Sequence, residues 1–236
     1  MNTVLIIFLV LVIMVAISLA IQFYNPNYLI RNSTPLNKPS GSQSTILVTS
    51  IDNPGSIRYF YEGWFFINAN QPVQTENVLF NRGNNFVVTL TGSTLNLYVN
   101  NNATDSTVSS AGILESTGSK PITRLASIHN FPFQKWTQIV INVDGQMIDI
   151  YIDGKFVQNV QSATPIVTNA VDPITYGNQY TLGFFTRFRR PVRNINPQGV
   201  WSSYMMGSGQ NNSISNDHLN LQLTKNKTIL LNQRLF

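Results

Sequence analysis

A run of alternating side chains over residues 136–160 constrains this chain more than any other feature. Apolar residues alternate with other residues along 139–143 and again along 148–152, which is the two-residue period of a strand with one buried face. Asp144-Gly145 and Asp153-Gly154 interrupt the alternation, and an Asp-Gly pair readily adopts the positive φ angles of a two-residue hairpin turn. Two such turns nine residues apart predict a three-strand antiparallel meander.

Further strands and one helix complete the prediction of a β-rich domain over residues 45–236. The helix is predicted where Asn196 can cap its start, Pro197 suits its first position and Gly207 ends it. Many short strands with one helix indicate an all-β sandwich. The other predicted strands are apolar or aromatic runs between turn residues, at 58–67, 77–80, 85–90, 94–99, 218–223 and 227–231.

The amino terminus carries a long apolar block. Fifteen of the twenty residues from 4 to 23 are Val, Ile, Leu or Phe, and none is charged. A helix of that length is about 30 Å long, which matches the hydrocarbon core of a bilayer. We therefore predict a transmembrane anchor over residues 1–24, with these residues in the membrane: Val4, Leu5, Ile6, Ile7, Phe8, Leu9, Val10, Leu11, Val12, Ile13, Ile17, Leu19, Ile21 and Phe23.

A cleaved secretion signal is the alternative interpretation of this block. Ser18-Leu19-Ala20 has the small-x-small pattern of a cleavage site, but residues 1–3 carry no Lys or Arg, and the apolar character continues past Ala20. A retained single-pass anchor is therefore favoured. Residues 25–44 contain four of the chain's prolines or glycines among Asn and Ser, and this composition predicts a partly extended stalk.

The charges that flank the block predict its orientation. Arg31 and Lys38 follow it, and no acidic residue precedes Asp52. By the positive-inside rule, the carboxy-terminal domain is expected on the cytoplasmic face. The chain has no cysteine, which fits a reducing compartment without requiring one.

Several segments resemble the concanavalin A-like lectin/glucanase superfamily in its laminin-G-like branch. They are Glu62-Gly63-Trp64, then residues 136–140 (WTQIV), 149–157 (DIYIDGKFV) and 180–184 (YTLGF), in that order. The resemblance implies a jelly-roll sandwich of two antiparallel sheets.

A narrower resemblance concerns the carboxy-terminal part. Residues 196–201, with Tyr204 and Gly207-Ser208-Gly209 after them, resemble the end of laminin-G-like proteins of large double-stranded DNA viruses. That resemblance implies a domain behind a short amino-terminal anchor, associated with a capsid or an inner membrane.

Acidic residues and histidines give little support for catalysis. Glycoside hydrolysis needs two carboxylates that flank the bond, and the glucanase branch carries them in a Glu-x-Asp-x-x-Glu spacing that is absent here. Asp144 and Asp153 are predicted as turn formers, and Glu62 as a paired or rim carboxylate. His129 and His218 have no partner at metal-ligand spacing and are expected at the surface or in loops. The chain is therefore predicted not to be an enzyme.

Metal and sugar sites are weakly indicated. Asp52, Asp105 and Asp172 lie in predicted loops and could contribute to a calcium site, but no spacing assembles them, so a metal is left open. Asn-rich loops at 68–70, 100–102 and 211–216 could bind sugar, although their composition equally suits turns, which we prefer.

Arg187, Arg189, Arg190 and Arg193 form the densest cluster of positive charge, with no acid among them. They are predicted to bind an anionic partner, such as lipid headgroups or an acidic protein; the alternative is a solvated loop. Nucleic acid is not expected, because few aromatic residues accompany the cluster.

The sequence thus predicts a structural protein, in which a membrane-anchored jelly-roll domain links a membrane to a protein shell. If the chain is viral, it would lie at the inner membrane or capsid layer of a virion, as a minor capsid protein. The expected partners are the lipid bilayer and other capsid or membrane-associated proteins, without a cofactor. The alternative is a membrane-anchored lectin that binds carbohydrate for surface attachment.

Overall fold

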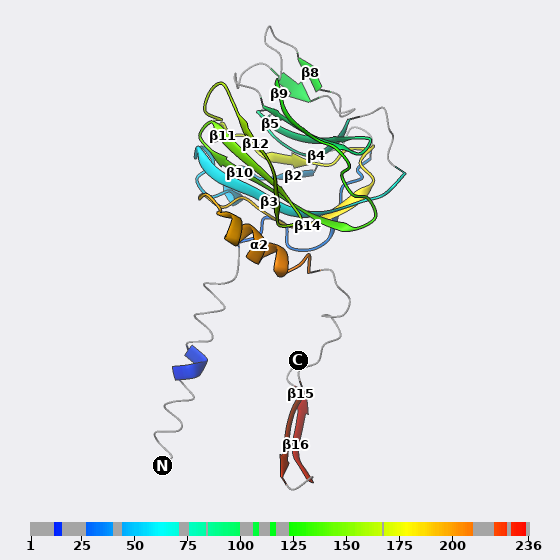
Figure 1. Cartoon of the computed structure of the whole chain (residues 1–236), viewed down its shortest axis with the longest axis vertical. Helices are drawn as coiled ribbons and strands as arrows, with labels where there is room; N and C mark the ends of the chain where they lie inside the picture. Colours follow the sequence, from blue (N-terminus) through cyan, green and yellow to red (C-terminus); the bar gives the residue numbers. More distant parts are fainter. Residues whose placement is uncertain are drawn as a thin grey trace.

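Two antiparallel sheets of six strands each pack face to face in the computed structural model of this chain (Figure 1). It describes residues 12–15, 27–39, 44–70, 76–83, 85–99, 106–108, 114–116, 123–166, 168–209, 220–225 and 228–234. The predicted two-sheet antiparallel sandwich with one short helix is confirmed at this level.

The first sheet has the strand order β1-β14-β3-β10-β11-β12. Its centre is the long antiparallel pair of β3 and β10, which stays in register from Arg58–Asp144 to Phe66–Trp136. The strands are β1 (Thr34–Pro35), β3 (Arg58–Ile67), β10 (Trp136–Asp144), β11 (Met147–Ile152), β12 (Lys155–Gln161) and β14 (Gly183–Arg189).

The second sheet has the strand order β2-β13-β4-β5-β6-β9. Its strands are β2 (Ser44–Ile46), β4 (Asn77–Arg82), β5 (Phe86–Thr91), β6 (Thr94–Val99), β9 (Thr123–Ile128) and β13 (Ile174–Tyr176). The predicted strand at 94–99 is confirmed at both ends. Two hairpins form separate sheets: β7 (Ser106–Val108) with β8 (Leu114–Ser116), and β15 (Asn220–Lys225) with β16 (Thr228–Arg234).

The predicted meander is present as β10, β11 and β12. Asp153 and Gly154 both have positive φ angles, 49° and 75°, as a type I′ turn requires. The first turn lies one residue later than predicted, because Asp144 still pairs with Met147 in the ladder. The loop residues are therefore Gly145, with φ 64°, and Gln146, which is the glycine-first pattern of a type II′ turn.

Aromatic side chains from both sheets fill the core. Strand β3 alternates strictly, so Tyr59, Tyr61 and Phe65 point inward and are at most 1% exposed. The ring centroid of Tyr61 lies 5.0 Å from that of Phe80 on the second sheet and 6.0 Å from that of Phe188 on β14. The first contact joins the two sheets and the second lies within the first sheet, and such ring pairs add about 0.5–1.5 kcal/mol each beyond area burial.

A β-bulge in β14 decides where the basic residues point. The pairing of β14 with β3 gains one extra residue at Arg187-Phe188, and Arg187 has a positive φ of 51°. Because of the extra residue, Arg189 lies opposite Glu62, while Phe188 is fully buried in the core. A bulge thus re-aims the side chains that follow it.

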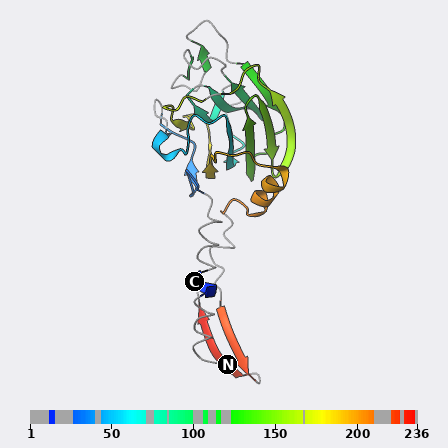
Figure 2. The same cartoon turned by 90° about the vertical axis from the view of Figure 1, so that its left-hand side faces the viewer.

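Helix α2 (Pro197–Met205) covers the outer side of the first sheet (Figure 2). Its predicted cap is confirmed, since the Asn196 side chain accepts a hydrogen bond of 2.7 Å from the backbone N–H of Gly199. The predicted stop is confirmed as well, because Gly207 has a φ of 69°.

The inner face of α2 packs on outward-pointing residues of β3, β10 and β11. Val200 is fully buried in a second apolar cluster with Phe60, Val140 and Tyr151. One turn later, the ring of Tyr204 stacks on Trp64 of β3, with centroids 5.6 Å apart. The helix is therefore a fixed part of the domain.

The segment expected as a stalk lies partly against the sandwich. Thr34-Pro35 pair with β14 at the edge of the first sheet, and Leu36 is fully buried in the core. An edge position tolerates the proline, which has no N–H to donate to a ladder. The sandwich therefore begins before the predicted boundary at residue 45.

The predicted anchor lies almost entirely outside the described residues. Of residues 1–24, the structure describes 12–15, which are helical. Across the described parts of the chain, no helix has both the length and the hydrophobicity that crossing a membrane requires.

Candidate functional site

A groove of about 360 Å³, lined by residues with polar side chains, lies on the outer side of the second sheet. It is far from the first sheet's outer side, where α2 packs, because the core of the sandwich separates the two. Its size falls near the lower end of the range of roughly 300–1,000 Å³ that is usual for small-molecule sites. The lining residues are Glu76, Thr91, Thr94, Asn96, Tyr98, Arg124, Ser127 and His129.

Strand alternation places these side chains on one face. In β6, Leu95 and Leu97 point into the core, so Asn96 and Tyr98 point outward. The neighbouring strand β9 shifts its register between Leu97 and Tyr98, which sets Arg124 opposite Tyr98. Polar residues from three strands thereby meet on one outer surface.

Hydrogen bonds fix the centre of the groove. The Asn96 side chain accepts a bond of 2.9 Å from the hydroxyl of Ser127 and donates one of 3.3 Å to the hydroxyl oxygen of Thr91. At one end, the Thr94 hydroxyl lies 3.1 Å from Nδ1 of His129. His129 is exposed, as predicted. The polar groups are therefore pre-positioned by strand neighbours.

Glu76 and Tyr98 form the shortest of these contacts. The phenol of Tyr98 donates a hydrogen bond of 2.5 Å to Oε1 of Glu76. Burial, together with this bond to a carboxylate, raises the pKa of Tyr98 to about 12. Tyr98 therefore stays a neutral donor through the physiological range, and the Glu76 carboxylate retains further acceptor positions.

The four predicted basic residues have different surroundings. Arg189 and Arg190 are buried, with 7% and 3% of their surface exposed, while Arg193 is exposed. Arg187 donates from NH1 to the backbone carbonyls of Met206 and Gly207, at 3.0 and 2.6 Å. The cluster is thus not a solvated loop, and Arg193 is the member that faces solvent.

Arg189 belongs to a polar network beneath α2. Its Nε and NH2 donate to Oε2 of Glu62 at 2.9 and 2.6 Å. The other oxygen of Glu62 accepts from Nε2 of Gln138 at 3.1 Å and from the hydroxyl of Ser203 on the helix. Glu62 is therefore a paired carboxylate, as predicted, and it ties α2 to the sheet.

Arg190 is directed at a loop instead of a carboxylate. Its NH1 and NH2 groups lie 3.2–3.4 Å from the backbone carbonyls of Asp52, Asn53, Pro54 and Ser56. Its guanidinium stacks 4.2 Å from the ring centroid of Tyr59, and burial lowers its pKa from the ordinary value. Arg82, which is fully buried, also donates to the Pro54 carbonyl at 2.9 Å.

A smaller hollow of about 180 Å³ lies over this basic segment. Its wall includes Arg193, whose side chain is exposed, and the edges of the two buried arginines. The lining residues are Asn27, Leu29, Ser50, Asp52, Arg189, Arg190, Pro191, Val192 and Arg193.

The structure brings no metal site together from the residues that it describes, since these contain no group of three or more His, Asp or Glu. Asp172 approaches Arg82, and burial raises the pKa of its carboxyl. Asp105 and His218 lie outside the described residues, as do the Asn-rich segments at 100–102 and 211–216.

Sequence reasoning did not identify the groove. It considered Asn-rich loops, whereas the groove is built on strands, with Asn96 and Ser127 opposite each other in the ladder. The available signal was the alternation in β6, which places Asn96 and Tyr98 on the face opposite to the leucines. The residues of β9 that face them, Ser127 and Arg124, can be identified only from the pairing of β6 with β9.

Comparisons with solved structures concern the fold. The chain is similar to the botulinum neurotoxin serotype D ligand binding domain in complex with N-acetylneuraminic acid, with 13% identity and a TM-score of 0.53 over 75% of this chain and 42% of that chain. The botulinum neurotoxin serotype D binding domain has 10% identity and a TM-score of 0.55, over 75% of this chain and 43% of that chain. The botulinum neurotoxin serotype G binding domain has 16% identity and a TM-score of 0.51, over 74% of this chain and 42% of that chain.

These likenesses show a shared β-sandwich fold and nothing more specific. The chain spans less than half the length of each of the three structures. No protein-family model matches the sequence, and no curated protein matches it.

Proposed function

We propose that this protein is a membrane-anchored, non-catalytic domain that binds carbohydrate in the groove of the second sheet. The observation that carries the proposal is the groove itself, in which hydrogen-bonded polar side chains from β5, β6 and β9 surround one tyrosine. The concanavalin A-like sandwich and the anchor over residues 1–24 belong to this proposal.

The groove offers the mixed chemistry that sugar hydroxyls need. Each hydroxyl can donate and accept, so a site needs both kinds of partner at fixed positions. The Glu76 carboxylate can accept, and the exposed Arg124 side chain can donate from its guanidinium N–H groups. Tyr98 adds a ring face and edge for the carbon-bound hydrogens of a sugar.

Similar folds support this assignment. One of the similar structures is a neurotoxin ligand binding domain in complex with N-acetylneuraminic acid. Its identity with this chain is 13%, so it supports a class of ligand for such a sandwich and no particular contact. The membrane-to-shell role lacks a comparable observation, and carbohydrate binding therefore replaces it as the main proposal.

The carboxylates support binding without hydrolysis. Among the residues that line the groove, Glu76 is the one carboxylate, whereas glycoside hydrolysis generally uses two. Asp149 on the other sheet accepts bonds from Asn142 and Asn159, and Glu62 is buried and paired. We therefore expect no turnover of a bound glycan.

Glycan-array screening of the full chain in detergent tests the proposal. We expect binding to one class of glycan, and a loss of about tenfold or more in affinity on Arg124→Ala, measured by calorimetry. Arg58→Ala is the matched control: its side chain is 69% exposed and pairs with Asp144 at the end of β10. Failure of the wild-type chain to bind any glycan class, or equal affinities in both variants, would contradict the proposal.

Topology is a second test. Recognition of sugars on an outer surface needs the domain on the outer face, whereas Arg31 and Lys38 favour the cytoplasmic face. Protease digestion of sealed vesicles with a known orientation distinguishes a domain on the outer face from one on the cytoplasmic face. Protection of the domain inside the cytoplasmic compartment would contradict surface attachment.

A further inference from the structure

Helix α2 exposes an uncharged face on which apolar side chains lie beside Gln198 and Ser202. Trp201 and Met205 of the helix, and Met206 directly after it, are 43%, 66% and 50% exposed. The helix contains no charged residue. We call these three residues the α2 face.

The α2 face is held rigidly toward solvent. Val200 is buried in the sandwich and Tyr204 stacks on Trp64, so the helix cannot turn its exposed side inward without losing both contacts. The turn at Gly154 packs against it, because a Cβ at Gly154 would lie 3.0 Å from atoms of Trp201 and Tyr204. Exposed apolar side chains that are held together in a fixed position are typical of an interaction site.

The neighbouring strand extends this surface. β12 contacts α2, and its residue Phe156, whose ring packs on Tyr151 of the second apolar cluster, is 56% exposed. The apolar area thus continues from the helix toward the edge strand of the first sheet.

Positive charge borders this surface. Lys155 precedes Phe156 and is exposed, and Arg193 is exposed three residues before the helix cap. Asp153, beside Lys155, is ion-paired with Lys135 at 2.8 Å, so its negative charge is balanced. Apolar residues with exposed cations beside them are typical of elements that lie in the headgroup region of an anionic membrane.

The chain leads from this surface toward its apolar block. Arg187 donates to the carbonyls of Met206 and Gly207, and the next residue, Phe188, pairs with Leu29 and Ile30. The described segment 27–39 therefore begins, at Asn27, close to the carboxy-terminal end of α2. Phe23, the last apolar residue of the block, lies four positions earlier, which is at most about 14 Å of extended chain.

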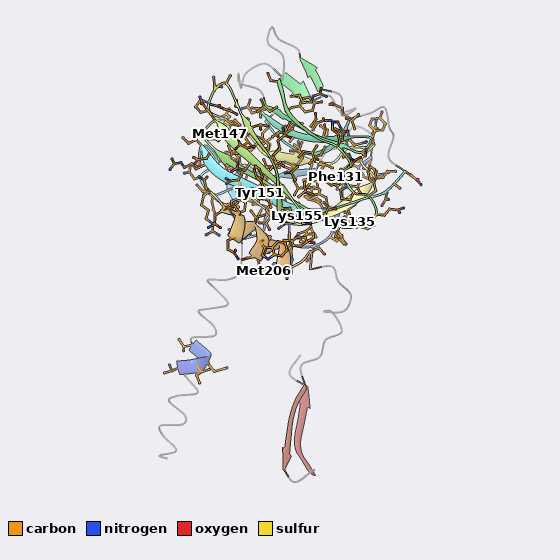
Figure 3. All side chains as sticks on the ribbon, viewed as in Figure 1. Phe131, Lys135, Met147, Tyr151, Lys155 and Met206 are labelled. Carbon is orange, nitrogen blue, oxygen red and sulfur yellow. The ribbon has the colours of Figure 1, made fainter. Side chains whose placement is uncertain are left out.

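We infer that the α2 face rests on an anionic lipid surface, with Trp201, Met205 and Met206 at the level of the headgroups and Lys155 and Arg193 beside anionic lipids. Trp is enriched at that depth in membrane proteins, and methionine adapts to irregular apolar surroundings. Figure 3 shows Met206 at the end of the sandwich that carries α2. This inference rests on the proposed anchor and is independent of sugar binding.

The absence of cysteine allows a direct test. The full chain with Met205→Cys, labelled with an environment-sensitive fluorophore, is placed at one copy per nanodisc of phosphatidylcholine and phosphatidylserine. Spin labels on the lipid headgroups should quench this fluorophore at least twofold. Arg124→Cys, exposed on the outer side of the second sheet, is the control and should not be quenched.

The charge contribution has its own control. In the Met205→Cys background, Arg193→Glu should reduce quenching by half or more, while Arg58→Glu, at the end of β3, should leave it unchanged. Equal quenching at positions 205 and 124, or none at 205, would overturn the inference. The inference would also be overturned if a second copy of the chain covered the α2 face. In that case the two fluorophores would lie close together at two copies per disc, and the lipid spin labels would not quench the fluorophore at one copy per disc. The glycan array reports on the groove separately, so the two proposals can fail independently.

Discussion

Arg189 holds the Glu62 carboxylate with two nitrogens, at 2.9 and 2.6 Å, in the layer between the first sheet and α2. Both side chains are almost fully buried. The pair forms because the extra residue at Arg187-Phe188 sets Arg189 opposite Glu62 of β3. It links β3 to the segment that carries the basic cluster.

Arg189→Met should lower the free energy of unfolding by about 3–5 kcal/mol, since it leaves a buried carboxylate without its cation. Glu62→Gln with Arg189→Met removes both charges, and should cost clearly less than the sum of the two single variants. Urea unfolding of the full chain in detergent, followed by tryptophan fluorescence, measures these differences. Strictly additive losses would show that the two residues are not energetically coupled.

Gly145 and Gly154 form a matched pair of turn glycines. Both have positive φ angles, but a Cβ at Gly145 would meet no atom within 4 Å, whereas one at Gly154 would lie 3.0 Å from Trp201 and Tyr204. Gly145→Ala should cost about 1–2 kcal/mol, for backbone strain alone. Gly154→Ala should cost more and change the fluorescence of Trp201, because α2 must shift. Equal losses with unchanged emission would contradict the contact.

Burial and the hydrogen bond to Glu76 raise the pKa of Tyr98, so the stability of the folded chain should depend on pH in the alkaline range. The pKa is raised from 10.0 to about 12 in the folded chain, so folding favours the protonated phenol. This contribution is complete below pH 10 and is lost as the pH rises from about 10 to about 12. The stability advantage over Tyr98→Phe should therefore shrink across that window, as urea unfolding at several pH values would show. Tyr180→Phe serves as the control, and a pH-independent difference for Tyr98→Phe would refute the assignment.

Arg190 should stabilise the loop at residues 52–56. Arg190→Met removes the donors to four carbonyls and should cost about 2 kcal/mol. Hydrogen exchange at the amide of Ser56, which donates to the Asn53 carbonyl, should accelerate. Arg193→Met, which changes an exposed arginine in the same segment, should leave exchange at Ser56 unaltered; an equal acceleration would contradict a specific role of Arg190.

Local patterns predicted much of the sandwich. The alternation of 136–160, the Asp-Gly turns and the cap at Asn196 each depend on residues close in sequence, and each has its expected counterpart in the structure. The one-residue offset of the first turn has a simple cause: Asp144 can close the ladder and leave Gly145 as the first loop residue.

Long-range pairing explains what the sequence did not reveal. The burial of Arg189 depends on one extra residue in β14 and on a carboxylate 127 positions away. The groove depends on the register of β6 with β9, whose facing residues Asn96 and Ser127 are 31 positions apart. Neither spacing is a motif, because pairing between strands that are far apart in the sequence brings each pair together.

The groove and α2 lie on opposite outer sides of the sandwich. A domain that rests on its own membrane through α2 would therefore open its groove away from that membrane. Sugars attached to the same bilayer would be out of reach, and those on a facing cell or particle would be accessible. The domain would then bind glycans on a facing surface, and glycans on the membrane that anchors the domain would not compete for the groove.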